Sequence, residues 1–164
     1  MKDSVDDQVE LWAAVIADID PRTEGIVTRM QRIVRYLGAR KAVSLEGLGL
    51  QVWECSTLHA LRRRGEPYAA GPTELAAELG VTGAAMTTRV DAMVRRGYVV
   101  RRHDRDDRRR NIVALTRKGV AAADRIIAGQ LDVEGELVGA LTESQQDQLT
   151  ALLRRLMHVV DANR

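Results

Sequence analysis

Apolar residues recur every three or four positions along much of this 164-residue chain, which is the pattern of helices that bury one face. Asp20 and Thr142 precede two of these patterns and can cap the free N–H groups of a first helical turn. The pattern therefore predicts a mainly α-helical fold. Longer helices are expected over residues 5–19, from Pro21 onward, over residues 50–63, from about Arg117 onward and after Thr142.

Two shorter helical patterns lie close together in the middle of the chain. Pro72 suits the first helical position, because the N–H that proline lacks would be unpaired there anyway. Gly80 can take the left-handed conformation that ends a helix, and Thr82 can cap the next one through its hydroxyl. The second helix then carries a buried stripe made of Met86, Val90 and Met93. This segment is predicted to be a helix-turn-helix.

A basic hairpin is predicted directly after these helices. Two short runs of β-forming and apolar residues, 98–100 and 112–115, flank a segment dense in arginine. Residues 89–118 carry a net charge of +7, whereas the whole chain carries +2, so the remaining residues carry −5. A basic segment of this kind attracts phosphate groups and releases counterions when it binds them.

A helix-turn-helix followed by a basic hairpin suits the grooves of DNA. A helix in the major groove approaches base edges near its N-terminus, where small and hydroxylated side chains leave room. Arginine at a hairpin tip suits a narrow minor groove. Taken alone, the helix pair could be an ordinary structural feature, and the basic segment could be a solvated loop. Their order along the chain favours DNA binding. The candidate contacts are Thr82, Gly83, Ala84, Thr87 and Thr88 on the helix, and Arg105, Arg108, Arg109 and Arg110 on the hairpin.

Three segments of the chain resemble the MarR family of bacterial transcription regulators: PTELAAELGVTGAAMTTRVDAMVRRGYV, DRDDRRRNIVALT and TRKG at Thr116–Gly119. The resemblance implies one domain, residues 1–164, with a winged helix-turn-helix DNA-binding region at residues 50–118. It also implies a homodimer that binds palindromic operators in double-stranded DNA, usually as a repressor. The resemblance further implies release from DNA by a small ligand or by oxidation.

The terminal helices carry more apolar surface than a small domain can bury. Residues 1–45 and 120–164 are therefore the expected dimerisation helices. The alternative is that these helices only cover the core of one subunit.

An effector pocket is expected from a finer resemblance. The helix that carries Trp12 looks like the extra N-terminal helix of the urate-responsive branch of the MarR family, to which aconitate-responsive members are similar. That resemblance places Trp12, Arg89 and Arg101 in a ligand pocket, whereas the branch's aspartate position falls on Ser56. Two arginines without this carboxylate favour a small anionic effector, aromatic or not. Alternatively, Trp12 packs between helices, Arg89 contacts a phosphate and Arg101 lies on the surface along its stem.

Other classes of function find little support in the sequence. It shows no catalytic motif, and its histidines are far apart, so neither an enzyme nor a metal or cofactor site is expected. No apolar run is long enough to span a membrane, and the acidic N-terminus lacks a signal-peptide core. With a single cysteine, the protein is expected in the bacterial cytoplasm, on the nucleoid when bound to DNA.

Two alternatives to a ligand-responsive regulator remain open. One is a redox-sensing regulator that uses Cys55, although a buried structural thiol is the more common state of a cysteine inside a helical pattern. The other is a winged-helix interaction module that does not bind DNA.

Overall fold

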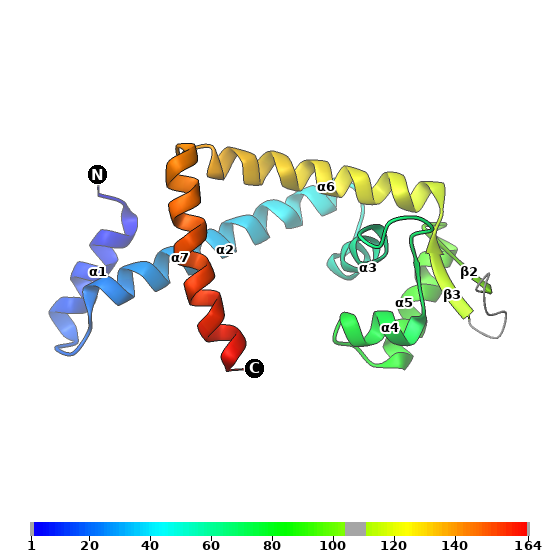
Figure 1. Ribbon diagram of the computed structural model, residues 1–164, viewed down its shortest axis with the longest axis horizontal. Coiled ribbons are helices and arrows are strands. Elements are labelled where there is room, and N and C mark those ends of the chain that lie inside the picture. The colour runs from blue at the N-terminus through cyan, green and yellow to red at the C-terminus, as the bar shows by residue number, and fades with distance from the viewer. Residues whose placement is uncertain (1, 104–110, 164) are drawn as a thin grey trace. The chain divides into compact units, whose positions relative to one another are not determined.

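The computed structural model describes residues 2–103 and 111–163, and it confirms a mainly α-helical fold with a small antiparallel sheet (Figure 1). Residues 1–55 and residues 56–164 form two compact units, each of which is described by itself. In chain order the elements are α1 (Ser4–Val15), α2 (Pro21–Gly47), α3 (Val52–Arg62), β1 (Ala69–Ala70), α4 (Pro72–Glu78), α5 (Gly83–Arg95), β2 (Val99–His103), β3 (Asn111–Leu115), α6 (Arg117–Val138) and α7 (Glu143–Ala162).

In the first unit α1 packs against α2, and Val5 and Val9 of α1 are buried. As predicted, Asp20 caps α2 and Pro21 is its first residue, because the Asp20 carboxylate accepts from the backbone N–H groups of the first turn. The predicted end of the first helix at Ile19 is wrong, since α1 ends at Val15. Aspartates near a helix C-terminus oppose its dipole, and the residue before a proline is disfavoured in the α conformation.

The second unit contains the predicted helix-turn-helix, formed by α4 and α5. Gly80 lies between them with a φ of 63°, the left-handed conformation that glycine adopts without strain. The Thr82 hydroxyl accepts from the backbone N–H of Ala85 at 3.2 Å, so Thr82 caps α5. Met86 and Val90 are fully buried on one side of α5. These contacts confirm the predicted turn and buried stripe.

A three-stranded antiparallel sheet in the order β1-β3-β2 lies next to these helices (Figure 1). The β2–β3 hairpin was predicted, and its register pairs Val99 with Leu115 and His103 with Asn111. The strand β1 was not predicted, because alanine has a low β-propensity and two residues carry no alternating pattern. It forms by pairing with the outer edge of β3, where Ala69 lies opposite Ala114.

The junction between β3 and α6 explains the sequence TRKG. The Thr116 hydroxyl donates to the carbonyl of Gly97 at 2.7 Å and accepts from the backbone N–H of Gly119, so it caps α6. A Cβ at Gly119 would lie 2.0 Å from the carbonyl oxygen of Tyr98, so no other residue fits there without a shift of the backbone. The start of α6 is thus fixed against the end of α5.

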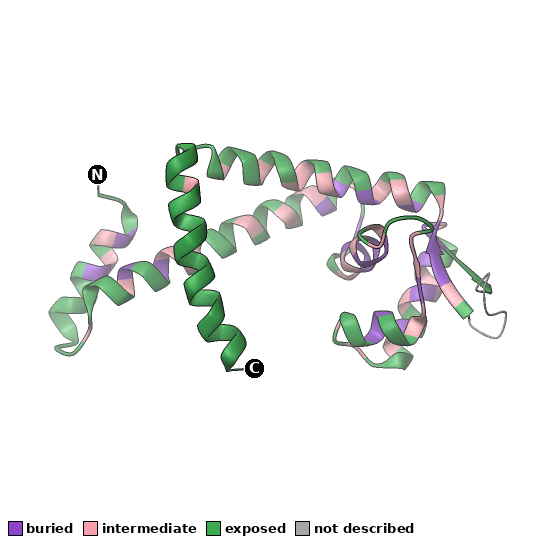
Figure 2. Cartoon of the chain, viewed as in Figure 1, coloured by how far each residue is buried: buried purple, intermediate pink, exposed green. Residues whose placement is uncertain are grey.

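Helix α7 is capped by Thr142 as predicted, and Gln145 completes a capping box with it. None of the residues of α7 is buried (Figure 2). Its apolar residues Leu152, Leu156 and Val159 are 57%, 46% and 62% exposed. An apolar stripe that remains in contact with water on a long helix is typical of a surface that another protein chain covers.

Candidate nucleic-acid interface

The exposed side of α5 carries small and hydroxylated residues. Gly83, Ala84, Thr87 and Thr88 are all exposed, whereas the buried stripe lies on the other side of the helix. Both threonine side chains are held against the helix. The Thr87 hydroxyl donates to the carbonyl of Gly83 at 3.0 Å, and the Thr88 hydroxyl donates to the carbonyl of Ala84 at 3.2 Å. The first half of α5 therefore presents an uncharged surface without long side chains, which allows another molecule to approach the helix backbone closely.

Two arginines attach the basic hairpin to its surroundings. Arg101 of β2 forms an ion pair with Asp91 of α5 at 2.8 Å, and it also donates to the carbonyl of Thr87 at 3.5 Å. Arg102 donates to the carbonyl of Pro67 at 3.4 Å, on the segment before β1. Both arginines are exposed. The hairpin base is thus fixed relative to the exposed side of α5.

The base of the hairpin also contacts α6. The ring of Tyr98, which is buried, lies 5.1 Å from the guanidinium of Arg96 and 4.8 Å from the ammonium of Lys118. Lys118 also donates to the carbonyl of Arg96, the C-cap residue of α5, at 2.8 Å. Cation–π contacts and a helix C-cap therefore hold α5, β2 and α6 together at one point.

Two arginines that directly follow α3 fix the position of α4. Arg64 donates to Glu74 at 2.9 Å and also bonds to Glu78, which Arg63 contacts as well. The Arg64 guanidinium holds the pKa of the Glu78 carboxyl below its usual value. Sequence reasoning missed this cluster. Its signal was the run of arginines before the turn together with two glutamates one helical turn apart on the next helix.

The remaining predicted contacts, Arg105, Arg108, Arg109 and Arg110, lie outside the described residues. Their roles therefore stay predictions from the sequence. The described part of the hairpin contributes the exposed cations Arg101 and Arg102 on the same strand.

Comparison with known proteins agrees with this geometry. The profile of the MarR family matches residues 48–110, which contain α3, α4, α5 and β2. The chain is therefore similar to the MarR family over these residues. It is 27% identical to the HTH-type transcriptional regulator PecS of Dickeya dadantii over 96% of this chain and 95% of PecS. It is 30% identical to the HTH-type transcriptional repressor YetL of Bacillus subtilis over 50% of this chain and 49% of YetL.

A solved structure of another protein gives the same fold. A point mutant of S. aureus MepR bound to an oligodeoxyribonucleotide superposes with a TM-score of 0.62 at 21% identity, covering 82% of this chain and 97% of the MepR chain. At this level of identity the likeness concerns the fold alone.

The predicted effector residues lie on separate elements of the structure. Trp12 is 45% exposed on α1, and Ser56 is half-buried on α3. Arg89 is half-buried on α5, whereas the Arg101 side chain contacts α5 at Thr87 and Asp91. Arg89 is two positions from Thr87 and two positions from Asp91, and two positions correspond to a rotation of about 200° around a helix. The Arg89 side chain therefore starts from a different side of α5 than the side that Arg101 contacts. The effector pocket stays a prediction.

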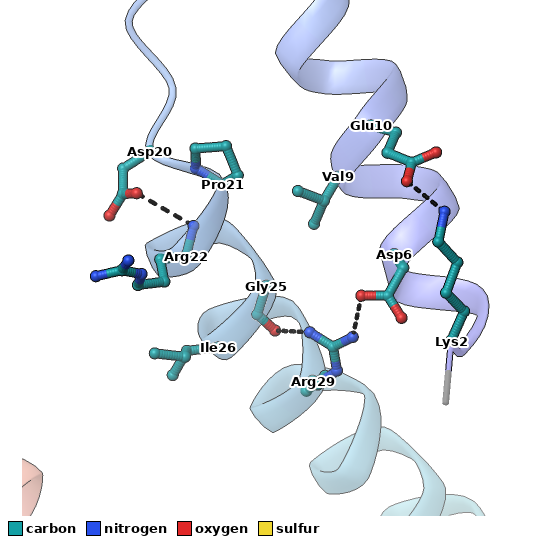
Figure 3. Close-up of a pocket in the computed structure, with 10 residues that line it drawn as sticks. All are labelled: Lys2, Asp6, Val9, Glu10, Asp20, Pro21, Arg22, Gly25, Ile26 and Arg29. Carbon is teal, nitrogen blue, oxygen red and sulfur yellow. Dashed lines mark hydrogen bonds and ion pairs between the residues drawn. The ribbon is translucent and has the colours of Figure 1, made fainter.

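A pocket of about 750 Å³ lies between α1 and the start of α2 (Figure 3). Arg29 extends from α2 across this junction and donates to Asp6 at 2.7 Å and to the carbonyl of Gly25 at 3.3 Å. Lys2 pairs with Glu10 at 2.6 Å on the rim. Trp12 is not among the lining residues. We attribute these charges to the attachment of α1 to α2 rather than to a ligand.

Cys55 is fully buried. Burial raises the pKa of its thiol, and Lys41 opposes that rise only in part. Since the thiolate is the reactive form, this environment disfavours the redox role that was left open for Cys55.

Within the described ranges, no helix is long and apolar enough to cross a membrane. The same residues contain no cluster of three or more side chains suited to hold a metal ion.

Proposed function

We propose that this protein is a sequence-specific DNA-binding transcriptional repressor that acts as a homodimer and is released by a small anionic ligand. The observation that carries the proposal is the exposed side of α5, which is small, uncharged and fixed against a basic hairpin by the Arg101–Asp91 pair. A helix of this shape can enter the major groove while the arginines of the hairpin contact phosphates or the minor groove.

The homodimer is supported by the apolar stripe of α7 and by exposed apolar residues on the first unit, such as Leu11, Val15 and Val34. Two-fold symmetry would place two copies of α5 one DNA turn apart, so the operator is expected to be a palindrome. The similarity to YetL, which is named as a repressor, supports repression rather than activation of transcription by this protein.

Release by a ligand is supported by the position of Arg101. Its guanidinium already pairs with Asp91, so an anion that recruits Arg101 must compete with that carboxylate. Loss of the pair would free the hairpin from α5 and shift the population toward forms that bind DNA poorly. Trp12, Ser56 and Arg89 are the other residues that we propose for this ligand.

The test is an electrophoretic mobility shift with the DNA upstream of the protein's own gene and an excess of unrelated competitor DNA. Gly83 is exposed at the start of α5 with open space around it, so Gly83→Glu should fold but abolish the shift. Gly135→Glu on α6, another open glycine, is the matched control and should still bind. If wild-type protein gives no shift at low salt, the interaction-module alternative is the correct one.

A further inference from the structure

The hydroxyl hydrogens of Thr87 and Thr88 are already used within α5. Each hydroxyl donates to the carbonyl four residues earlier, that of Gly83 or that of Ala84. A hydroxyl has one hydrogen to donate and two lone pairs that accept. At a DNA surface these two side chains can therefore accept hydrogen bonds and offer their methyl groups, but they cannot donate without first breaking a bond to the helix.

Within α5 itself, the exposed neighbours near the start of the helix add no other side chain that reads bases, and Thr82, which precedes α5, caps the helix through its hydroxyl. Gly83 and Ala84 carry no polar side-chain group, and the Asp91 carboxylate is paired with Arg101. Sequence discrimination by the first half of α5 therefore depends on the two threonines.

The four base pairs differ in what they offer to such side chains. In the major groove guanine presents two acceptors, N7 and O6, which an acceptor cannot bind. Thymine presents a methyl group at C5, and its partner adenine presents an N6 donor. A T·A pair thus matches both properties of a threonine whose hydrogen is already donated. A G·C pair offers only the N4 donor of cytosine and no methyl group, and guanine itself matches neither property.

We propose that Thr87 and Thr88 select T·A base pairs in the operator half-site, with the thymine methyl as the main recognised group and guanine excluded at the same positions. The proposal rests on the proposed function, because it requires that α5 enters the major groove.

The experiment begins with sites selected from a random-sequence duplex library by the full-length protein. The selected half-sites are expected to carry T·A pairs where α5 docks. Each such thymine is then replaced by deoxyuridine, which removes only the 5-methyl group. The expected loss of affinity is about fourfold per contacted methyl, equivalent to about 0.8 kcal/mol. The methyl lies in the major groove, so contacts of the hairpin in a minor groove are unaffected.

Two variants separate the methyl group from the hydroxyl. Thr88→Val keeps a methyl and removes the hydroxyl, so it should bind within about twofold of wild type and remain sensitive to deoxyuridine. Thr88→Ser keeps the hydroxyl and removes the methyl, so it should lose that sensitivity. The same pair of changes at Thr87 repeats the test, and thermal melting confirms that each variant is folded.

The outcomes distinguish this inference from the proposed function. If wild-type protein selects sites with guanine under the threonines, or if deoxyuridine leaves affinity unchanged, the inference is wrong while DNA binding stands. If Thr88→Ser keeps the deoxyuridine effect and Thr88→Val loses it, the hydroxyl is the recognised group and the inference is likewise wrong. If wild-type protein selects no site at low salt, the proposed function itself fails.

Discussion

Arg101 of β2 and Asp91 of α5 form an ion pair at 2.8 Å that connects the base of the basic hairpin to the exposed side of the helix. The two side chains are 47% and 42% exposed, so the pair adds little to the stability of the fold. Its importance is geometric, since it sets the direction of the hairpin relative to α5.

Removal of the carboxylate tests this relationship. Asp91→Ala makes the surface more basic, which alone would strengthen attraction to DNA. If the pair orients the hairpin, Asp91→Ala should instead weaken binding to the specific operator several-fold while binding to unrelated DNA increases. Fluorescence anisotropy with both duplexes measures the two affinities. A combined Asp91→Ala/Arg101→Ala variant should lose little beyond the Arg101→Ala change, and stronger operator binding by Asp91→Ala would contradict this role.

Gly119 should be indispensable at the start of α6. Gly119→Ala brings a Cβ against the carbonyl of Tyr98, and this overlap with backbone should outweigh the gain of about 1 kcal/mol from a better helix former. The expected net loss of stability is roughly 1–3 kcal/mol in urea unfolding. Gly135→Ala in the same helix, where nothing lies within 4 Å, should be neutral or stabilising. Equal effects of the two changes would refute the proposed contact.

The ion pairs of Glu78 predict a dependence of stability on pH. Arg64 lowers the pKa of Glu78, so the native state binds this proton less readily than the unfolded chain does. The stabilisation is therefore complete above the ordinary glutamate pKa of about 4.3 and is lost as the pH falls through the lowered value. Urea unfolding of wild type and Glu78→Gln between about pH 7 and pH 3 should give free energies that converge in acid. A constant difference would show that the ion pair is not responsible.

The apolar stripe of α7 should hold the dimer. Leu152→Glu combined with Leu156→Glu places two charges in the expected interface and should convert the protein to a monomer with much weaker operator binding. Ala151→Glu lies about 100° around the helix from the nearer of these leucines and is the control. Sedimentation velocity measures the association state. A dimer that survives the double substitution would place the interface elsewhere.

The sequence predicted those features that depend on local chemistry. Thr82, Gly80 and Pro72 act through their own backbone neighbourhood, so the helix-turn-helix could be located without a structure. The ion pair of Arg101 with Asp91 could not be predicted, because the sequence assigned Arg101 to a ligand pocket and gave Asp91 no role. The contact depends on how β2 leaves α5. The strand β1 was missed for a related reason, since Ala69 and Ala70 form a strand only by pairing with β3.

The central claim is that α5 and the basic hairpin bind DNA together, and the salt dependence of operator affinity tests it most directly. The logarithm of the binding constant for the upstream duplex should fall linearly with the logarithm of salt concentration, by about 0.9 per phosphate contact. Arg109→Ala should weaken binding and reduce the slope by about one, whereas Arg154→Ala on α7 should change neither. A slope near zero, or one that Arg109→Ala leaves unchanged, would contradict the account.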